Sequence, residues 1–210
     1  MPSVTRKTSS SRTERRDALR DRLLTAVEKL LADGENYTEL SVERLAAEAG
    51  ISRSTFYVYF EDKGELLRAW FVEIFGRVEG AAQQWYGLPP GFSRDDLRAA
   101  LAHVVGTYRP HTPLMAAVVD ASGYDPAVRE LVTGMMRRNT ASLRKHIRAG
   151  QAARSVDATL PADETAAWLT WMAERGFHQL VRGASDAEVD RLVGAYAAIV
   201  WNTLYAPARR

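Results

Sequence analysis

The chain of 210 residues contains no cysteine, which excludes disulfide bonds, thiolate nucleophiles and cysteine-ligated metal sites. It also lacks any apolar run close to the ~18 residues that a membrane-spanning helix requires, so we expect no membrane partner. The first residues are polar and basic and have none of the apolar core of a secretory signal. We therefore expect a cytoplasmic protein.

The sequence is equally poor in the patterns of enzymes. Its four histidines have neither His-x3-His nor His-Glu-x-x-His spacing, which argues against a metal site; they are His103, His111, His146 and His178. A phosphate-binding glycine loop and the Gly-x-Ser-x-Gly pattern are both absent. Acidic pairs such as Asp95-Asp96 are better explained as helix caps. We expect no catalytic residues and no cofactor, although an enzyme is the alternative class.

Net charge is small, at +2, but it is unevenly distributed. Residues 1–22 contain seven basic and three acidic residues, a net charge of +4, so the remainder carries −2. A basic segment at one end of a chain can add salt-dependent affinity for the phosphates of nucleic acids. We expect residues 1–12 to form a flexible basic arm, and a solubilising tail is an equally good interpretation of this Ser- and Thr-rich stretch.

Residues 40–60 predict two short helices joined by a tight turn. Ser41 is a good N-cap for the first helix, and Gly50 follows its apolar stripe where a residue of positive φ is favoured. Ser52 caps the second helix, in which Phe56 and Phe60 lie four residues apart and face the core. The outer face of this second helix then carries hydroxyl groups, an arginine and two phenols, as a DNA recognition helix requires. A polar face on an ordinary small helical domain is the alternative.

The remainder also reads as helical, without sustained strand alternation. We expect an all-α fold of about nine helices: an N-terminal three-helix DNA-binding domain of the helix-turn-helix type, and a larger helical domain. The other helices are expected at about 13–32, 61–86, 93–107, 110–121, 126–149, 162–182 and 186–205. Capping signals support several starts, among them Asp125-Pro126 and the pair Ser185 and Glu188.

The last two expected helices, 162–182 and 186–205, are apolar on more than one face. A helix with two apolar faces must bury both. The second face either enters one large core or pairs with a second copy, and a two-fold dimer suits a protein that reads two half-sites. We therefore predict a homodimer through these two helices.

The second half is rich in large, adaptable side chains that suit a cavity for apolar molecules. At helical spacing such residues are more often plain core, but Asn139 lies on the same stripe as Met135 and its amide needs a partner. Glu174 and Arg175, in an otherwise apolar helix, are expected to have a structural role. The candidate ligand-binding residues are Tyr108, Met115, Met135, Met136, Asn139, Trp168, Trp171, Met172, Phe177 and Trp201.

The segment Ser52-Arg53-Ser54-Thr55-Phe56-Tyr57-Val58-Tyr59-Phe60, followed by Lys63 and Leu66, resembles the DNA-binding signature of the TetR family of repressors. The resemblance implies that Arg53, Ser54, Thr55, Tyr57 and Tyr59 contact base edges or nearby phosphates, with Arg53 the best candidate for a guanine contact. It implies that the DNA backbone is contacted by Ser41, Arg44, Ser52 and Lys63.

On this resemblance the chain divides into an arm (1–12), a DNA-binding domain (13–60), a ligand-binding and dimerisation domain (61–205) and a tail (206–210). The expected function is that of a repressor released from double-stranded operator DNA by a small, largely apolar effector. An architectural DNA-binding protein without an effector is a third class, but it gives the Met- and Trp-rich half no purpose.

Overall fold

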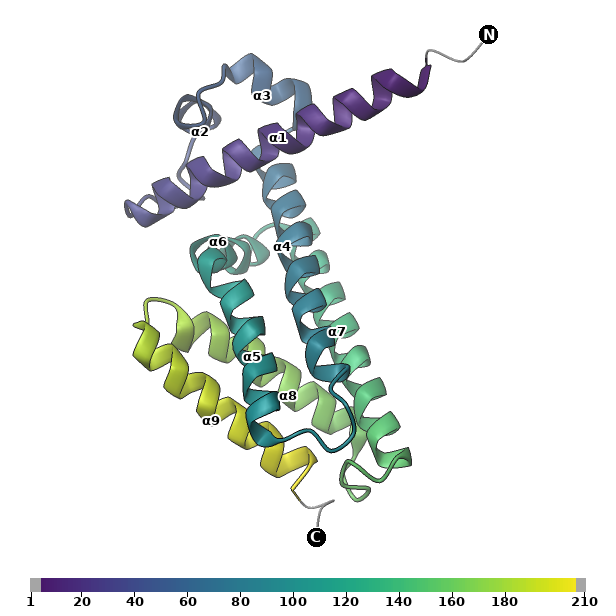
Figure 1. Ribbon diagram of the computed structural model, residues 1–210. Coiled ribbons are helices and arrows are strands. Elements are labelled where there is room, and N and C mark those ends of the chain that lie inside the picture. Colours follow the sequence, from purple (N-terminus) through teal and green to yellow (C-terminus); the bar gives the residue numbers. More distant parts are fainter. Residues whose placement is uncertain (1–4, 207–210) are drawn as a thin grey trace. The chain divides into compact units, whose positions relative to one another are not determined.

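The computed structural model describes the backbone of residues 5–206 and the side chains of residues 14–206. Within these residues it is built from helices, without a β-strand. In order they are α1 (Thr5–Ala32), α2 (Val42–Glu48), α3 (Arg53–Tyr59), α4 (Lys63–Tyr86), α5 (Arg94–Tyr108), α6 (Thr112–Ser122), α7 (Pro126–Ala152), α8 (Ala162–Gly176) and α9 (Asp186–Leu204) (Figure 1). The all-α fold predicted from the sequence is confirmed.

Two boundaries differ from the expectation. Helix α1 begins at Thr5 rather than near Thr13, so residues 5–12 are helical, while residues 1–4 of the expected arm lie outside the described part of the chain, as do tail residues 207–210. The expected helix 162–182 is α-helical only to Gly176 and continues as a π-helical turn, Phe177–Val181.

Contacts group the residues into two compact units. The first contains the chain up to Glu73 together with Pro113–Val128, and the second contains Ile74–Thr112 and the residues from Arg129 onward. Helix α4 therefore contributes to both units, and α6 belongs mainly to the first. This grouping differs from the expected boundary after Phe60, because the start of α4 packs with the helices before it.

The first unit is organised around aromatic and aliphatic side chains of α1 to α4. Phe56, Phe60 and Trp70 are almost completely buried, and the Phe56 and Phe60 rings lie 5.6 Å apart between centroids. The indole Nε1 of Trp70 donates to the backbone oxygen of Arg20 at 3.2 Å, which joins α4 to α1. The short helices α2 and α3 are thereby held on a common core.

The second unit has a separate core in which α5 and α9 pack together with parts of α4, α7 and α8. Leu97 of α5 and Ala197 and Val200 of α9 are fully buried there. The expected capping box at Ser185 is present, with Glu188 Oε2 accepting from the Ser185 nitrogen at 2.8 Å. Asp125 caps α7 as expected, because its Oδ1 accepts from Ala127 N at 2.8 Å.

None of the helices in the described part of the chain combines the length and the apolar character needed to cross a membrane.

Candidate functional site

Helices α2 and α3 are joined by a turn whose backbone geometry is fully defined. Gly50 adopts a φ of +66°, and its N–H donates to Ala47 O while the N–H of Ile51 donates to Ala46 O at 2.9 Å. This pair of bonds ends α2 in a Schellman motif, which favours glycine at the left-handed position. Arg22 of α1 also stabilises this turn, because its Nη2 donates to Ala49 O at 2.7 Å and to Gly50 O at 3.1 Å. The sequence reasoning missed this role of Arg22.

Hydroxyl groups cluster at the start of α3. Ser52 caps the helix by accepting from Thr55 N at 3.0 Å, and its Oγ also lies 2.8 Å from Ser54 Oγ and from Thr55 Oγ1. Ser52 and Ser54 are exposed, whereas Thr55 is half-buried. The structure therefore brings these three predicted residues together on one exposed end of the helix.

Arg53 and Tyr57 lie beside this cluster. The Arg53 guanidinium lies 5.5 Å from the centroid of the Tyr57 ring and forms an ion pair with Glu43 of α2. The side chain of Arg53 remains 61% exposed, and Tyr57 is 46% exposed. Tyr59 is half-buried. The exposed face of α3 thus presents a cation, a phenol and several hydroxyl groups.

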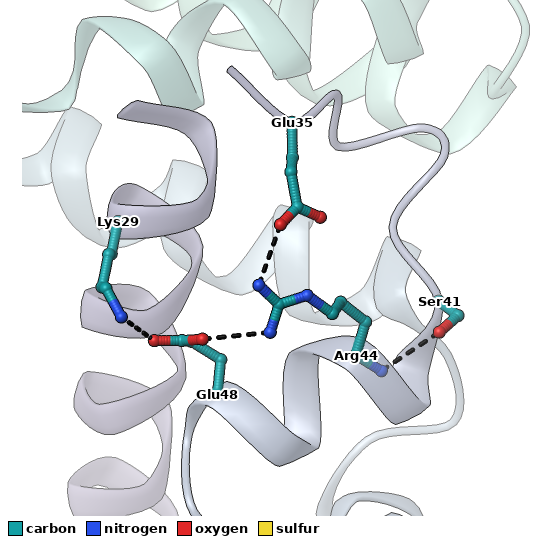
Figure 2. Close-up of polar contacts among 5 residues, drawn as sticks. All are labelled: Lys29, Glu35, Ser41, Arg44 and Glu48. Atoms are coloured by element: carbon teal, nitrogen blue, oxygen red, sulfur yellow. Dashed lines mark hydrogen bonds and ion pairs between the residues drawn. The ribbon is translucent and has the colours of Figure 1, made fainter. Parts of the chain in front are cut away.

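Arg44 takes part in an exposed charge network on α2 (Figure 2). Its guanidinium contacts Glu35 at 2.9 Å and Glu48 at 3.0 Å, and Glu48 also pairs with Lys29 of α1. Hydrogen bonds from Lys29 and then Arg44 lower the pKa of Glu48 below its usual value. Figure 2 also shows the Ser41 side chain accepting from the backbone nitrogen of Arg44, at 3.1 Å, as the predicted N-cap does.

Lys63, expected to contact the DNA backbone, has a different environment in the structure. Its ammonium donates to the backbone oxygens of Tyr37, Thr38 and Leu40 at 3.0, 2.6 and 2.8 Å. The Tyr37 hydroxyl donates in return to Lys63 O at 2.6 Å. Three donated bonds use all the donors of an ammonium group, so in this conformation Lys63 fastens the loop before α2 and leaves no N–H for a phosphate.

The second unit contains a cavity of about 240 Å³ lined by α4, α5, α7 and α8, with Tyr196 of α9. We call it the four-helix cavity. Four of the ten candidate ligand-binding residues line it: Tyr108, Met136, Asn139 and Phe177. The sequence reasoning missed the contribution of α4, where Trp85 and Tyr86 line the cavity, and that of Glu79, Arg138 and Glu174.

A second hollow of about 720 Å³ lies along α8, the π-helical turn and α9, and we call it the α8–α9 groove. Three more candidates, Trp168, Trp171 and Met172, line this groove together with Phe177. Trp168 is 77% exposed and Trp171 50% exposed. The groove is therefore an apolar surface, and these residues lie outside the four-helix cavity.

The last three candidates line neither hollow. Met115 and Met135 are buried, in α6 and α7. Trp201 packs against Phe92 and Tyr205, with ring centroids 5.8 and 5.6 Å away. These residues have the helical spacing of core positions, and their large side chains fill the interior.

A pair of aromatic residues and a histidine form a buried hydrogen-bonded group in the second unit. Trp85 Nε1 donates to Tyr205 Oη at 2.8 Å, and His146 Nε2 lies 2.8 Å from the same oxygen. Burial lowers the pKa of His146 to about 4. The group is satisfied when the Tyr205 hydroxyl donates to a neutral His146, so its role is structural.

Among the described residues there is no group of histidine, aspartate and glutamate side chains that could hold a metal ion. The hollows and the exposed α3 face are the features of the structure that could bind another molecule.

Comparison with known proteins agrees with this arrangement. Residues 23–70 match the model of the TetR family of bacterial regulatory proteins, and residues 97–206 match the C-terminal domain of the transcriptional regulator EthR. The chain is 30% identical to the HTH-type transcriptional regulator EthR of Mycobacterium tuberculosis, over 86% of this chain and 84% of that protein. It is 25% identical to EthR of Mycolicibacterium smegmatis, over 89% and 86% of the two chains.

A solved structure shares the fold at lower identity. The fatty acid degradation regulator FadR of Bacillus halodurans superposes with a TM-score of 0.71 at 16% identity, covering 87% of this chain and 94% of that one. The families and relatives that match are regulators of transcription and not enzymes. The chain belongs to the TetR family of bacterial transcriptional regulators, which bind operator DNA, and it carries the C-terminal domain of the EthR group.

Proposed function

We propose that this regulator is a homodimeric repressor that reads its operator with the exposed face of α3 and is released by a small, largely apolar effector in the four-helix cavity. The observation that carries the proposal is the α3 face, where Arg53, Tyr57 and the Ser52 hydroxyl cluster are exposed above the buried Phe56 and Phe60. Recognition helices present short polar and basic side chains to base edges in this way.

Base reading is assigned to Arg53, Ser54, Thr55, Tyr57 and Tyr59, and backbone contact to Ser41, Arg44 and Ser52. Arg44 and Arg53 are engaged by glutamates in the free protein, but these ion pairs are exposed. Exposed pairs are worth only about 0–1 kcal/mol, so phosphates or guanine can displace them. Lys63 is assigned instead to positioning α2, because three backbone carbonyls already bind its ammonium.

The dimer is proposed to form through α8 and α9. Trp168, Trp171, Leu180 and Ile199 are all large, apolar and exposed along the α8–α9 groove. A contiguous apolar patch of this kind marks an interaction surface, and a second copy presenting the same patch would cover it in an isologous contact.

Helix α4 offers a route by which an effector changes DNA binding. Several residues of its second half, among them Phe75 and Tyr86, line the four-helix cavity, while its residues up to Glu73 belong to the unit that carries α3. An effector that favours one orientation of α4 would change the spacing of the two recognition helices in the dimer. A coupling of about 1–3 kcal/mol changes operator affinity roughly 5–150-fold.

The DNA-reading part is tested with Arg53→Ala, measured by fluorescence anisotropy on the operator and on a scrambled duplex. We expect operator binding to weaken by about 1–3 kcal/mol and the preference at one base pair to relax, because a bidentate guanine contact is lost. Glu43→Gln, which removes the partner of Arg53, serves as the matched control and should not weaken operator binding. Equal losses on both duplexes with Arg53→Ala would show that Arg53 contacts only the backbone.

The effector part is tested separately. Compounds that raise the melting temperature of the protein are added to the protein–operator complex, and the operator affinity is measured again. Release of the operator supports the proposal, whereas binding of such compounds without any change in operator affinity contradicts it.

A further inference from the structure

The charged residues of the four-helix cavity are unevenly paired. Three charged side chains line it: Glu79, Arg138 and Glu174. Arg138 Nε lies 3.7 Å from Glu79 Oε1, so these two form an ion pair. The pairing within the lining leaves the negative charge of Glu174 in excess.

Glu174 itself lies on α8 with one carboxylate oxygen enclosed. Its Oε2 is buried and has no hydrogen-bond partner among the described residues. Arg175 Nε lies 4.0 Å from this oxygen, so the two side chains form a long ion pair without a hydrogen bond. The Arg175 side chain is 60% exposed and lines the α8–α9 groove rather than the cavity. A buried carboxylate oxygen without a donor carries a desolvation cost that a bound cation would offset.

Aromatic rings surround the same space. Trp85, Tyr86, Tyr108, Phe177 and Tyr196 all line the cavity. The ring centroids of Tyr108 and Phe177 are 5.5 Å apart, and those of Phe177 and Tyr196 are 6.3 Å apart. Burial, and next the charge of Glu174, raise the pKa of the Tyr108 hydroxyl, which is the effect of a carboxylate close to this ring.

We propose that the effector of this regulator is a compact organic cation, an ammonium group with an apolar surface, held by the Glu174 carboxylate and the aromatic side chains of the four-helix cavity. The inference rests on the proposed function, since it names the chemical class of the effector for that site. Aromatic faces attract ammonium groups through the ring quadrupole, and quaternary ammonium ligands are bound in such aromatic cages.

The size and polarity of the cavity limit the ligand further. Its volume, about 240 Å³, lies below the roughly 300–1,000 Å³ typical of sites for drug-sized ligands, so the cation must be small. A neutral ligand of the same shape would contact the aromatic rings equally well but would offer no positive charge to the Glu174 carboxylate. An anionic ligand would add repulsion. Charge, rather than shape, should therefore decide between isosteric ligands.

The test compares two cations with neutral isosteres in which carbon replaces the nitrogen. Choline is paired with 3,3-dimethylbutan-1-ol, and phenyltrimethylammonium with tert-butylbenzene. Each is titrated into the full-length protein by calorimetry, and the melting temperature and operator affinity are measured in parallel. The variants are Glu174→Gln, which keeps the shape and removes the charge, and Glu79→Gln as the matched control with a paired carboxylate in the same cavity.

We expect the cations to bind about tenfold or more tightly than their isosteres, as a charge-assisted contact predicts. Glu174→Gln should abolish this preference, and Glu79→Gln should largely keep it. Without ligand, Glu174→Gln should melt at the same or a higher temperature than the parent, because it removes the charge from a group whose buried oxygen has no hydrogen-bond donor, and this result also establishes that the variant folds.

Three outcomes overturn the inference: isosteres that bind as tightly as the cations, no binding of either cation, or the same loss of cation affinity in both variants. The proposed function is judged by a different readout. If neutral compounds release the operator and cations do not, only the cation inference fails. If cations bind with the expected preference but operator affinity never changes, the effector mechanism fails while the charge preference stands.

Discussion

Lys63 is the residue whose position most changes the interpretation of the site. Its ammonium group binds the backbone carbonyls of Tyr37, Thr38 and Leu40. These residues precede Lys63 in the sequence by 26, 25 and 23 positions. Burial lowers the pKa of Lys63 from its usual value, although the group remains a triple donor here. A lysine that closes a loop in this way controls where α2 begins, and we propose that it affects DNA binding through the position of α2 and α3.

Replacing Lys63 by methionine distinguishes a role in holding the loop before α2 from a role in contacting DNA phosphates. We expect Lys63→Met to lower the free energy of unfolding by about 1–3 kcal/mol, because partly buried carbonyls lose their donor. Lys29→Met, at an exposed ion pair with Glu48, is the control and should change stability little. Urea unfolding measures both. Unchanged stability together with weaker binding to all DNA sequences would instead favour the phosphate contact that the sequence predicted.

His146 gives the second residue-scale prediction, a dependence of stability on pH. Its pKa is lowered from 6.5 to about 4 by burial. Between these values the unfolded chain binds the proton and the folded one does not, so stability rises with pH across this window and is lost as the pH falls from about 6.5 to about 4.

The expected loss is on the order of 3 kcal/mol, and above pH 7 this group adds no pH dependence. Melting temperatures across pH 4 to 8 measure it, and His146→Gln should reduce the slope in this window while keeping a hydrogen-bonding partner for Tyr205. A parent protein whose stability is flat from pH 6.5 to 4.5 would show that His146 is accessible to protons in the folded state.

At the scale of elements, the turn between α2 and α3 fixes the orientation of α3, the proposed recognition helix. It depends on two backbone bonds, a glycine of positive φ and the guanidinium of Arg22. A Cβ at Gly50 would also lie 3.3 Å from Arg22 Nη2. The turn therefore tolerates a side chain poorly, for reasons of both backbone conformation and space.

We expect Gly50→Ala to destabilise the protein by about 1 kcal/mol or more and to weaken operator binding, since a non-glycine residue at this φ is strained. Gly80→Ala is the control, for which we expect a change of stability in the opposite direction. Gly80 lies inside α4, and a Cβ there would point into open space with no neighbouring side chain within 4 Å, so alanine should raise stability by roughly 0.5–1 kcal/mol. Thermal unfolding of the two variants should give shifts of opposite sign, and shifts of the same sign would refute the argument.

At the scale of the whole molecule, the proposed dimer would link assembly to DNA binding. A helix-turn-helix dimer reads two half-sites, and a single copy loses the benefit of binding both. The exposed apolar side chains of the α8–α9 groove are the surface on which this linkage is proposed to depend.

Trp168→Glu tests the linkage, because a charge placed on a buried apolar interface opposes association. We expect the variant to be monomeric by light scattering and to bind the operator at least about tenfold more weakly. Val72→Glu, at another exposed apolar position on α4 (56% exposed), should leave the mass and the operator affinity unchanged. A Trp168→Glu protein that keeps the mass of the parent would exclude this surface as the interface.

Local sequence patterns were sufficient to predict many of the helix caps, turns and buried positions of this structure. Ser41 and Ser52 cap the helices for which they were predicted, Gly50 ends α2, and Phe56 and Phe60 are buried. Each of these features depends on residues within a few positions of one another, so helical periodicity and turn chemistry predict it. The same patterns could not predict which aromatic residues of the second half line the cavity, which line the groove and which fill the core. Positions of all three kinds recur with the same helical spacing.

The sequence by itself determined the all-helical architecture, the helix-turn-helix unit and the family, since these depend on local hydrogen bonding and on a short motif. Only the tertiary structure decided the features that depend on long-range contacts. Lys63 binds the loop before α2. Trp168 and Trp171 lie on an apolar surface while Tyr108 and Phe177 line a cavity. Glu174 lines that cavity and has one buried carboxylate oxygen without a hydrogen-bond donor. The physical reason is that burial and pairing of a side chain depend on which distant helices pack beside it, and no short stretch of sequence contains that information.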